Sequence, residues 1–194
     1  MPVYIGGSNI GKIYIGNQKI AKVYVGRQLI YNDAVQCIQQ GKLLDSSCFS
    51  RIENMSDLSA YEGYMADYPI FGCQDQGDYS SANPFDQSLS ATGRLYFSPS
   101  VYGEKCTMTY RIFSSARWGS SSGYITIGST TIIDRDDRNA VTDGYHVKPE
   151  TVRTTSFIIS SSNSVLTFHI EYDGTSTFWA PSVWVGVVSM KIGD

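Results

Sequence analysis

Residues 165–172 read Val-Leu-Thr-Phe-His-Ile-Glu-Tyr, and this alternation decides the fold. Every second position is apolar or aromatic: Leu166, Phe168, Ile170 and Tyr172. The positions between them are polar: Thr167, His169 and Glu171. Because successive side chains of a strand point to opposite faces, the segment predicts a strand with one buried and one solvent-facing side.

Other strands are predicted on both sides of this segment. Residues 106–112 alternate apolar and polar side chains in the same way, and residues 183–192 form a final apolar run. Gly128-Ser129 separates two short strand-like runs, 124–127 and 130–133, and therefore predicts a hairpin.

A second hairpin is predicted where Ser161-Ser162-Asn163 separates the runs 155–160 and 165–172.

The chain has 194 residues, of which 42% are hydrophobic and 17% are charged, so it can form a packed core. Short strands joined by serine-rich turns predict an all-β, jelly-roll-like β-sandwich over residues 61–194. Its general layout resembles that of carbohydrate-binding-module-like sandwiches, a fold-level analogy that brings no site with it.

The segment before this body, residues 33–60, is predicted to be a connector. Asp33 is a candidate N-cap for a short helix that reaches Gln40, and Gly41 is the candidate stop. Residues 61–93 are rich in Tyr, Asp, Gly, Ser and Pro, which predicts long loops with one strand around residues 69–73.

The N-terminal segment is a threefold decapeptide repeat, which reads VYIGGSNIGK, IYIGNQKIAK and VYVGRQLIYN from residue 3 onward. Three columns recur at a spacing of ten: Tyr4, Tyr14 and Tyr24; Gly6, Gly16 and Gly26; Ile10, Ile20 and Ile30. Each unit has about six residues of strand chemistry and about four of turn chemistry, which predicts a β-meander over residues 1–32. Loops of three or five residues would keep the tyrosines on one face and loops of two or four would alternate them, and the sequence leaves both open.

The strand-like part of each repeat is apolar at three consecutive positions, as in Ile13-Tyr14-Ile15. Both faces of such a strand are apolar, and a sheet this small cannot bury both by itself. Either the repeats pack on the rest of this chain, or they dock onto another protein or onto copies of themselves. In the second case the predicted contact residues are Tyr4, Ile5, Ile10, Tyr14, Ile15, Ile20, Tyr24, Val25 and Ile30.

The charge is divided unevenly between the repeats and the body. Residues 1–32 hold four basic and no acidic residues, which leaves 11 basic against 18 acidic residues in the remainder. A basic apolar strip suits an acidic partner surface, although the same charges would let it lie on its own acidic body.

These tandem units, hydrophobic–Tyr–hydrophobic–Gly–three residues–Ile, resemble repeats in structural proteins of tailed bacteriophages, often fibre or tail components. The resemblance implies a non-enzymatic virion protein of head or tail fibre or decoration type, assembled in the bacterial host cytoplasm. It also implies that residues 1–31 attach the chain to capsid, portal or tail proteins. We expect a homo-oligomer, a trimer before a dimer, because closed symmetry lets one surface bury itself repeatedly.

No catalytic residue, metal site or cofactor is predicted. The one Gly-x-Ser-x-Gly sequence, at residues 119–123, is not interpreted as a nucleophile elbow because no helix is predicted after it, and the chain has only two histidines. His169 and Glu171 share one strand face and offer two metal ligands without a predictable third, so a solvated polar face is the favoured interpretation. The charged run from Asp134 to Asn139 does not match an EF-hand loop and is interpreted as a surface loop, with a loose calcium site as the alternative.

The aromatic residues support a second function, that of a carbohydrate-binding or adhesin-type module for a host glycan. Trp118 and Trp179 lie in loop-like sequence and, with Tyr124, are the candidate ligand-binding residues. Burial in a core is the commoner fate of tryptophan and is the favoured interpretation for Trp184, which lies inside an apolar run.

Charge and hydropathy exclude two further classes of partner. The formal net charge is −3 and the isoelectric point is near 5.3, which argues against binding to nucleic acid through phosphates. No apolar stretch of about 18 residues suggests a membrane span, and the N-terminus does not read as a signal peptide.

The four cysteines contain no Cys-x-x-Cys pair and are expected to be free thiols, with one disulfide as the alternative.

Overall fold

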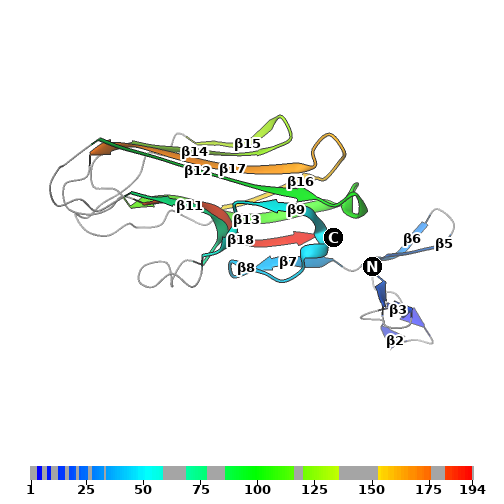
Figure 1. Ribbon diagram of the computed structural model, residues 1–194. Helices are drawn as coiled ribbons and strands as arrows, with labels where there is room; N and C mark the ends of the chain where they lie inside the picture. Colours follow the sequence, from blue (N-terminus) through cyan, green and yellow to red (C-terminus); the bar gives the residue numbers. More distant parts are fainter. Residues whose placement is uncertain are drawn as a thin grey trace.

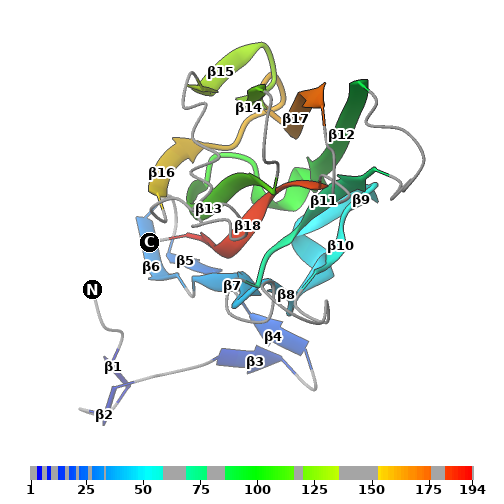
Figure 2. The ribbon, with the colours of Figure 1, turned by 90° about the vertical axis from the view of Figure 1, so that its left-hand side faces the viewer.

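The computed structural model describes an all-β protein (Figure 1). It covers residues 34–58, 69–77, 86–115, 120–135, 153–175 and 182–193, together with the strand residues of the N-terminal repeats. Two antiparallel sheets face each other, and Figure 2 shows them as two layers. The prediction of an all-β sandwich is confirmed.

The first sheet is built around the C-terminal strand. Its order is β10 (Ser56–Asp57), β11 (Phe71–Gln76), β18 (Ser182–Ile192), β13 (Lys105–Ser115) and β16 (Arg153–Ile158). β7 (Val35–Gln39) pairs with the last residues of β18, and β8 (Lys42–Leu43) pairs with β7. β18 therefore has strands on both sides over most of its length.

The second sheet contains five strands. Its order is β15 (Thr130–Arg135), β14 (Ser120–Ile127), β17 (Val165–Thr175), β12 (Asp86–Phe97) and β9 (Phe49–Glu53). Two short 3-10 turns, η1 (Ser46–Cys48) and η3 (Pro99–Val101), lie just before β9 and just after β12. The predicted β14–β15 hairpin is confirmed, with Gly128 at a φ of +56° in its turn.

The strand order is that of a jelly roll. When β11 to β18 are numbered one to eight, the first sheet has the order one, eight, three, six, and the second has two, seven, four, five. Successive strands therefore cross repeatedly between the sheets, as two interlocked Greek keys require. β10 and β9 extend the two sheets of this eight-stranded framework at their edges, and β7 with β8 adds to the last residues of β18.

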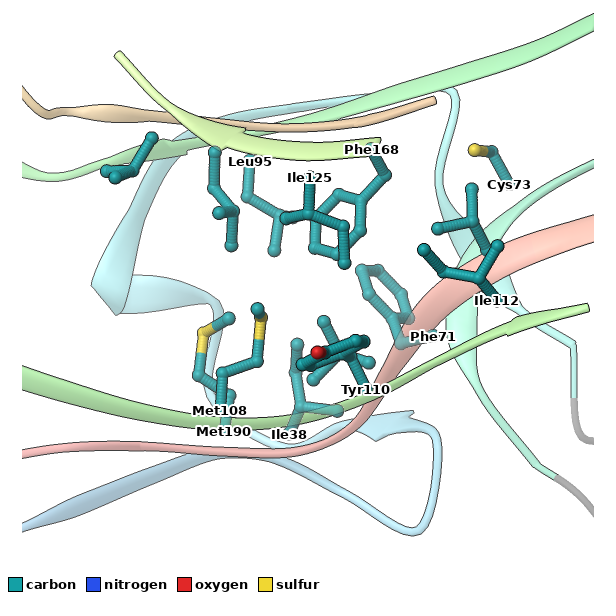
Figure 3. Close-up of a cluster of buried hydrophobic side chains, with 14 of the residues drawn as sticks. Ile38, Phe71, Cys73, Leu95, Met108, Tyr110, Ile112, Ile125, Phe168 and Met190 are labelled. Atoms are coloured by element: carbon teal, nitrogen blue, oxygen red, sulfur yellow. The ribbon is translucent and has the colours of Figure 1, made fainter. Parts of the chain in front are cut away.

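The core fills the space between the two sheets, as Figure 3 shows. Leu95, Ile125 and Phe168 point into it from the second sheet, opposite Met108 and Met190 of the first. All five side chains are fully buried. The apolar positions of the segment 165–172 belong to this core, which confirms the prediction from its alternation.

The second predicted hairpin is wrong, because β16 and β17 belong to different sheets. β16 pairs with β13, whereas β17 pairs with β12 and β14. Between them, Ile159 is fully buried and its N–H donates to the carbonyl of Glu104. At the other end, the N–H of Phe97 donates to the carbonyl of Ser164. The connection is thus a crossover between the sheets, held at both ends by backbone hydrogen bonds.

The predicted helix over residues 33–40 is also wrong. Residues 35–39 form β7, which turns through Gln40 and Gly41 into β8. Both turn residues have positive φ, +48° and +69°, as a type I′ hairpin requires. A Cβ on Gly41 would lie 2.5 Å from the backbone nitrogen of Ile70, so there is no room for a side chain at this position. Because β7 and β8 pair on either side of the turn, this glycine follows a strand and not a helix. The segment predicted as a connector supplies strands to both sheets.

The three N-terminal repeats form three separate hairpins instead of one meander. β1 (Tyr4–Ile5) pairs with β2 (Ser8–Asn9), β3 (Ile13–Ile15) with β4 (Gln18–Ile20), and β5 (Lys22–Val25) with β6 (Gln28–Asn32). Each repeat thus supplies two strands separated by two residues that begin with glycine, the sequence pattern of a two-residue hairpin loop. Among the strand residues that are described, none of the six pairs with the sandwich, and Figure 1 draws them outside its two sheets.

The four cysteines are buried free thiols: Cys37, Cys48, Cys73 and Cys106. Burial raises the pKa of Cys73 to about 12 and also raises that of Cys106. Hydrogen bonding with Cys48, followed by burial, raises the pKa of Cys37. The same hydrogen bond lowers the pKa of Cys48, so burial alone protects that thiol, and inaccessible thiols react slowly.

We expect no cysteine of the native protein to react rapidly with Ellman's reagent, and all four to react once urea unfolds the chain. The reason is that the reagent needs an accessible thiolate. Absorbance of the released thionitrobenzoate gives the count, and a reduced sample of the unfolded protein serves as the control. Rapid labelling of any thiol in the native state would contradict the buried placement.

Candidate functional site

The solvent-facing side of the second sheet carries an exposed aromatic residue among polar groups. Tyr124 lies on β14 and is 39% exposed, whereas its neighbours Gly123 and Ile125 are buried on the core side. Leu44 and Ile158 are the other large hydrophobic residues exposed in the described part of the chain, and Tyr124 is the aromatic one. Trp118 and Trp179, predicted to join it, lie outside the described residues.

Tyr124 belongs to a row of three residues that crosses three strands. The register pairs Tyr124 with His169 on β17, and His169 in turn with Thr92 on β12. The phenol ring stacks on the imidazole with 4.6 Å between ring centroids and 27° between planes. One face of the tyrosine ring is therefore packed against protein.

Both nitrogens of His169 are engaged. Nδ1 lies 2.8 Å from Oγ1 of Thr92, and Nε2 lies 2.8 Å from Oε1 of Glu171. The histidine side chain is only 14% exposed, while that of Glu171 is 61% exposed. The imidazole is thus fixed between a hydroxyl and a carboxylate, and its orientation sets that of the tyrosine ring above it.

The next row of the same face is formed by Ser122, Glu171 and Ser90, which are paired across β14, β17 and β12. All three are exposed. The backbone N–H of Ser90 donates to Oδ2 of Asp75, which joins this edge of the second sheet to β11. A carboxylate between two exposed hydroxyls therefore lies beside the aromatic row.

His169 and Glu171, for which a solvated polar face was favoured over a metal site, form a hydrogen bond with each other. In the described part of the chain no group of three His, Cys, Asp or Glu side chains is placed to hold a metal ion. Residues 136–139 of the alternative calcium loop lie outside the described residues, so that prediction stays open.

A second polar cluster lies on the same sheet face, next to β9. The hydroxyl of Tyr96 donates to Oε2 of Glu53 at 2.7 Å, and Glu53 also forms ion pairs with Arg51 and Arg94. The hydrogen bond from Tyr96, helped by both guanidinium groups, lowers the pKa of Glu53, and the same hydrogen bond raises the pKa of Tyr96. Arg51 lies over one face of the Tyr96 ring, 5.5 Å from its centroid, and Tyr96 is half-buried whereas Tyr124 is exposed.

Trp184 lies on the opposite side of the molecule, on the outer face of the first sheet. It packs with Val188 against the buried residues Leu58 and Ile70. Its indole nitrogen donates to Oε1 of Gln74 at 2.8 Å. It is a half-buried packing residue with a satisfied donor and lies outside the main core, so the expected core position is met only in part.

The residues predicted to contact a partner lie on the N-terminal hairpins. Tyr4, Tyr14 and Tyr24 hold equivalent positions in β1, β3 and β5 and pair with Asn9, Lys19 and Leu29. The others that are described occupy strands of the same hairpins: Ile5, Ile15, Ile20, Val25 and Ile30. The third hairpin has a register shift, because Val23 pairs with Tyr31 and Tyr24 with Leu29. Ile10 lies outside the described residues.

Sequence reasoning named Tyr124, His169 and Glu171 but missed Thr92, Ser90 and Ser122. Thr92 is 77 positions from His169, and only the jelly-roll crossing makes β12 and β17 neighbours. The signal that was available is the alternation along β12, which places polar residues at every second position of its first half. Alternation tells which face a residue takes but not which strand lies beside it.

No protein-family model and no curated protein matches the chain. Among solved structures, it is similar to a beta-glucosidase from Kluyveromyces marxianus in complex with glucose, with TM-score 0.34 and 13% identity over 79% of this chain and 18% of that one. It is also similar to an alpha-xylosidase from Xanthomonas citri, with TM-score 0.32 and 12% identity over 83% of this chain and 16% of that one. The chain spans less than a fifth of either protein, and such scores support no functional argument.

Within the described residues, no helix has the length and hydrophobicity needed to cross a bilayer.

Proposed function

We propose that the chain is a non-enzymatic structural protein of a tailed-bacteriophage virion, of head or tail fibre or decoration type. The N-terminal hairpins attach it to a capsid, portal or tail protein, and the jelly-roll body projects from the particle. The proposal includes a homo-oligomer, with a trimer preferred, and no catalytic role.

The observation that carries the proposal is the pairing of the three hairpins. Each of them pairs only within its own repeat among the described strands, and the sandwich completes both of its sheets without them. A two-stranded hairpin by itself is at best marginally stable in water. Three apolar hairpins in tandem therefore gain most from a surface outside the sandwich.

The charge distribution supports an acidic partner. The first 32 residues carry four basic side chains and no acidic one, while the rest of the chain has seven more acids than bases. Charge complementarity of this kind favours association of the hairpins with an acidic surface and raises its rate. The regular spacing of ten residues also suits a partner that offers equivalent positions, such as a symmetric ring or the neighbouring subunits of an oligomer.

We expect peptides of this chain in purified particles of the virus that encodes it. Particles from infected cells would be banded on a density gradient, washed at moderate salt and analysed by mass spectrometry, with a non-structural protein of the same virus as the control. The expected result is enrichment of the chain with the major capsid protein. Its presence in the lysate but absence from the particles would overturn the proposal.

A further inference from the structure

We propose that the outer face of the β14–β17–β12 sheet is a binding platform for neutral carbohydrate, built from the rows Tyr124–His169–Thr92 and Ser122–Glu171–Ser90. The platform belongs to the jelly-roll body and does not depend on how the hairpins attach. It assigns a function to a face that virion attachment leaves unused.

The aromatic half of the platform is exposed and fixed in orientation. Tyr124 presents a ring that is 39% exposed, and the side of it that faces the protein is stacked on His169. The imidazole is itself held by Thr92 and Glu171, each 2.8 Å from one of its nitrogens. A ring that is ordered before binding costs little conformational entropy when a ligand packs on it.

The polar half supplies groups that recognise hydroxyls. Glu171 is 61% exposed, and only its Oε1 is hydrogen bonded to His169, so the carboxylate can still accept hydrogen bonds from a ligand. Ser122 and Ser90 flank it in the register, and both are exposed. Hydrogen bonds to an ionised acceptor are the stronger kind, and hydroxyl side chains both donate and accept.

A sugar ring is the ligand that matches both halves at once. Its C–H face is apolar and packs on an aromatic ring, while its edge carries hydroxyls that can bond with polar side chains. Charge disfavours the acidic sugars, because Glu171 lies in the platform and Asp134 holds the register position next to Tyr124 on β15. Neutral hexose polymers remain, and an open sheet face suits a chain that lies along it.

The second tyrosine of this face is a natural contrast. The Arg51 guanidinium lies over one face of the Tyr96 ring, and the tyrosine hydroxyl donates to Glu53. Tyr96 is half-buried, so it offers a ligand less ring surface than Tyr124, and its hydroxyl hydrogen is already engaged. We expect the Tyr96→Phe variant to bind carbohydrate as the unaltered protein does.

The test is affinity electrophoresis of the full chain in native gels that contain dextran, mannan, galactan or, for comparison, polygalacturonate. We expect at least one neutral polymer to retard the protein and polygalacturonate not to. Tyr124→Ala should weaken that binding by about tenfold or more, because it removes the stacking surface, whereas Tyr124→Phe should retain it. Ile158→Ala, which removes an exposed apolar side chain from the other sheet, is the matched control and should bind normally.

Three outcomes would overturn the platform. They are no retardation by any neutral polymer, retardation by polygalacturonate alone, and equal retardation of the Tyr124→Ala variant. Circular dichroism of each variant excludes unfolding as the cause of a loss. Glu171→Gln, which keeps the size of the side chain but removes its charge, is expected to weaken binding less than Tyr124→Ala.

Discussion

Replacing Gly72 by alanine should destabilise the fold strongly. Gly72 on β11 is paired directly with Gly186 on β18, so two residues without side chains face each other across the strands. A Cβ on Gly72 would lie 2.2 Å from the carbonyl oxygen of Val185 and 2.9 Å from the Cα of Gly186. Both atoms belong to the backbone of the central strand, which is paired with β13 on its other side and cannot move away without breaking that pairing.

We expect this single methyl group to lower the free energy of unfolding by about 3 kcal/mol or more, a large part of the 5–15 kcal/mol that a domain of this kind has. Urea denaturation followed by circular dichroism measures the change. Gly186→Ala should behave similarly, because its Cβ would lie 2.6 Å from both the Cα of Gly72 and the carbonyl oxygen of Phe71.

Gly103→Ala is the matched control for this prediction. Gly103 has a φ of +89°, but no atom lies within 4 Å of the position that its Cβ would take. The alanine there costs only the backbone strain of a positive φ, about 1 kcal/mol. If Gly72→Ala were no more destabilising than Gly103→Ala, the close approach of β11 and β18 would be wrong.

The sequence predicted the parts of the fold that depend on local alternation. The polar and apolar faces of residues 165–172 were assigned correctly because the core takes every second side chain of β17. The β14–β15 hairpin was also correct, since Gly128 supplies the positive φ that its turn requires. In both cases the information lies within a few neighbouring residues.

The errors arose where a distant strand decides the local structure. Ser161-Ser162-Asn163 reads as a hairpin turn, yet the flanking strands join different sheets because Ile159 is buried and bonded to the turn before β13. Residues 35–39 read as the start of a helix, yet pairing with β18 makes them a strand. Each decapeptide supplies two paired strands and not the single strand expected of it, because the two residues that begin with glycine separate strands of one hairpin.

The candidate site shows the same division. Tyr124 and the alternation that exposes His169 and Glu171 were available from short stretches of sequence. That Tyr124 stacks on His169, and that Thr92 holds the far side of the imidazole, depends on the order β14–β17–β12. Strand order follows from how the chain crosses between sheets, which no local pattern encodes.

Deleting residues 1–33 should abolish incorporation into particles while leaving the body folded. The deletion removes all three hairpins and ends just before β7, whose pairing with β18 is kept. No described strand of the hairpins pairs with the sandwich, so the free energy of unfolding is expected to stay close to that of the full chain. The proposed attachment surface, by contrast, is lost entirely.

The experiment compares full-length and truncated protein in particles produced by the encoding virus, with incorporation measured by quantitative mass spectrometry and oligomeric state by light scattering. A third variant, with Tyr4, Tyr14 and Tyr24 all replaced by serine, keeps the chain length and the four basic residues. It should be incorporated as poorly as the truncated chain if apolar contact drives attachment, and nearly as well as the full chain if charge alone does. Two results would contradict the proposed role of the hairpins. Normal incorporation of the truncated chain would place attachment on the jelly-roll body, and failure of the truncated chain to fold would mean that the hairpins cover the sandwich of their own chain.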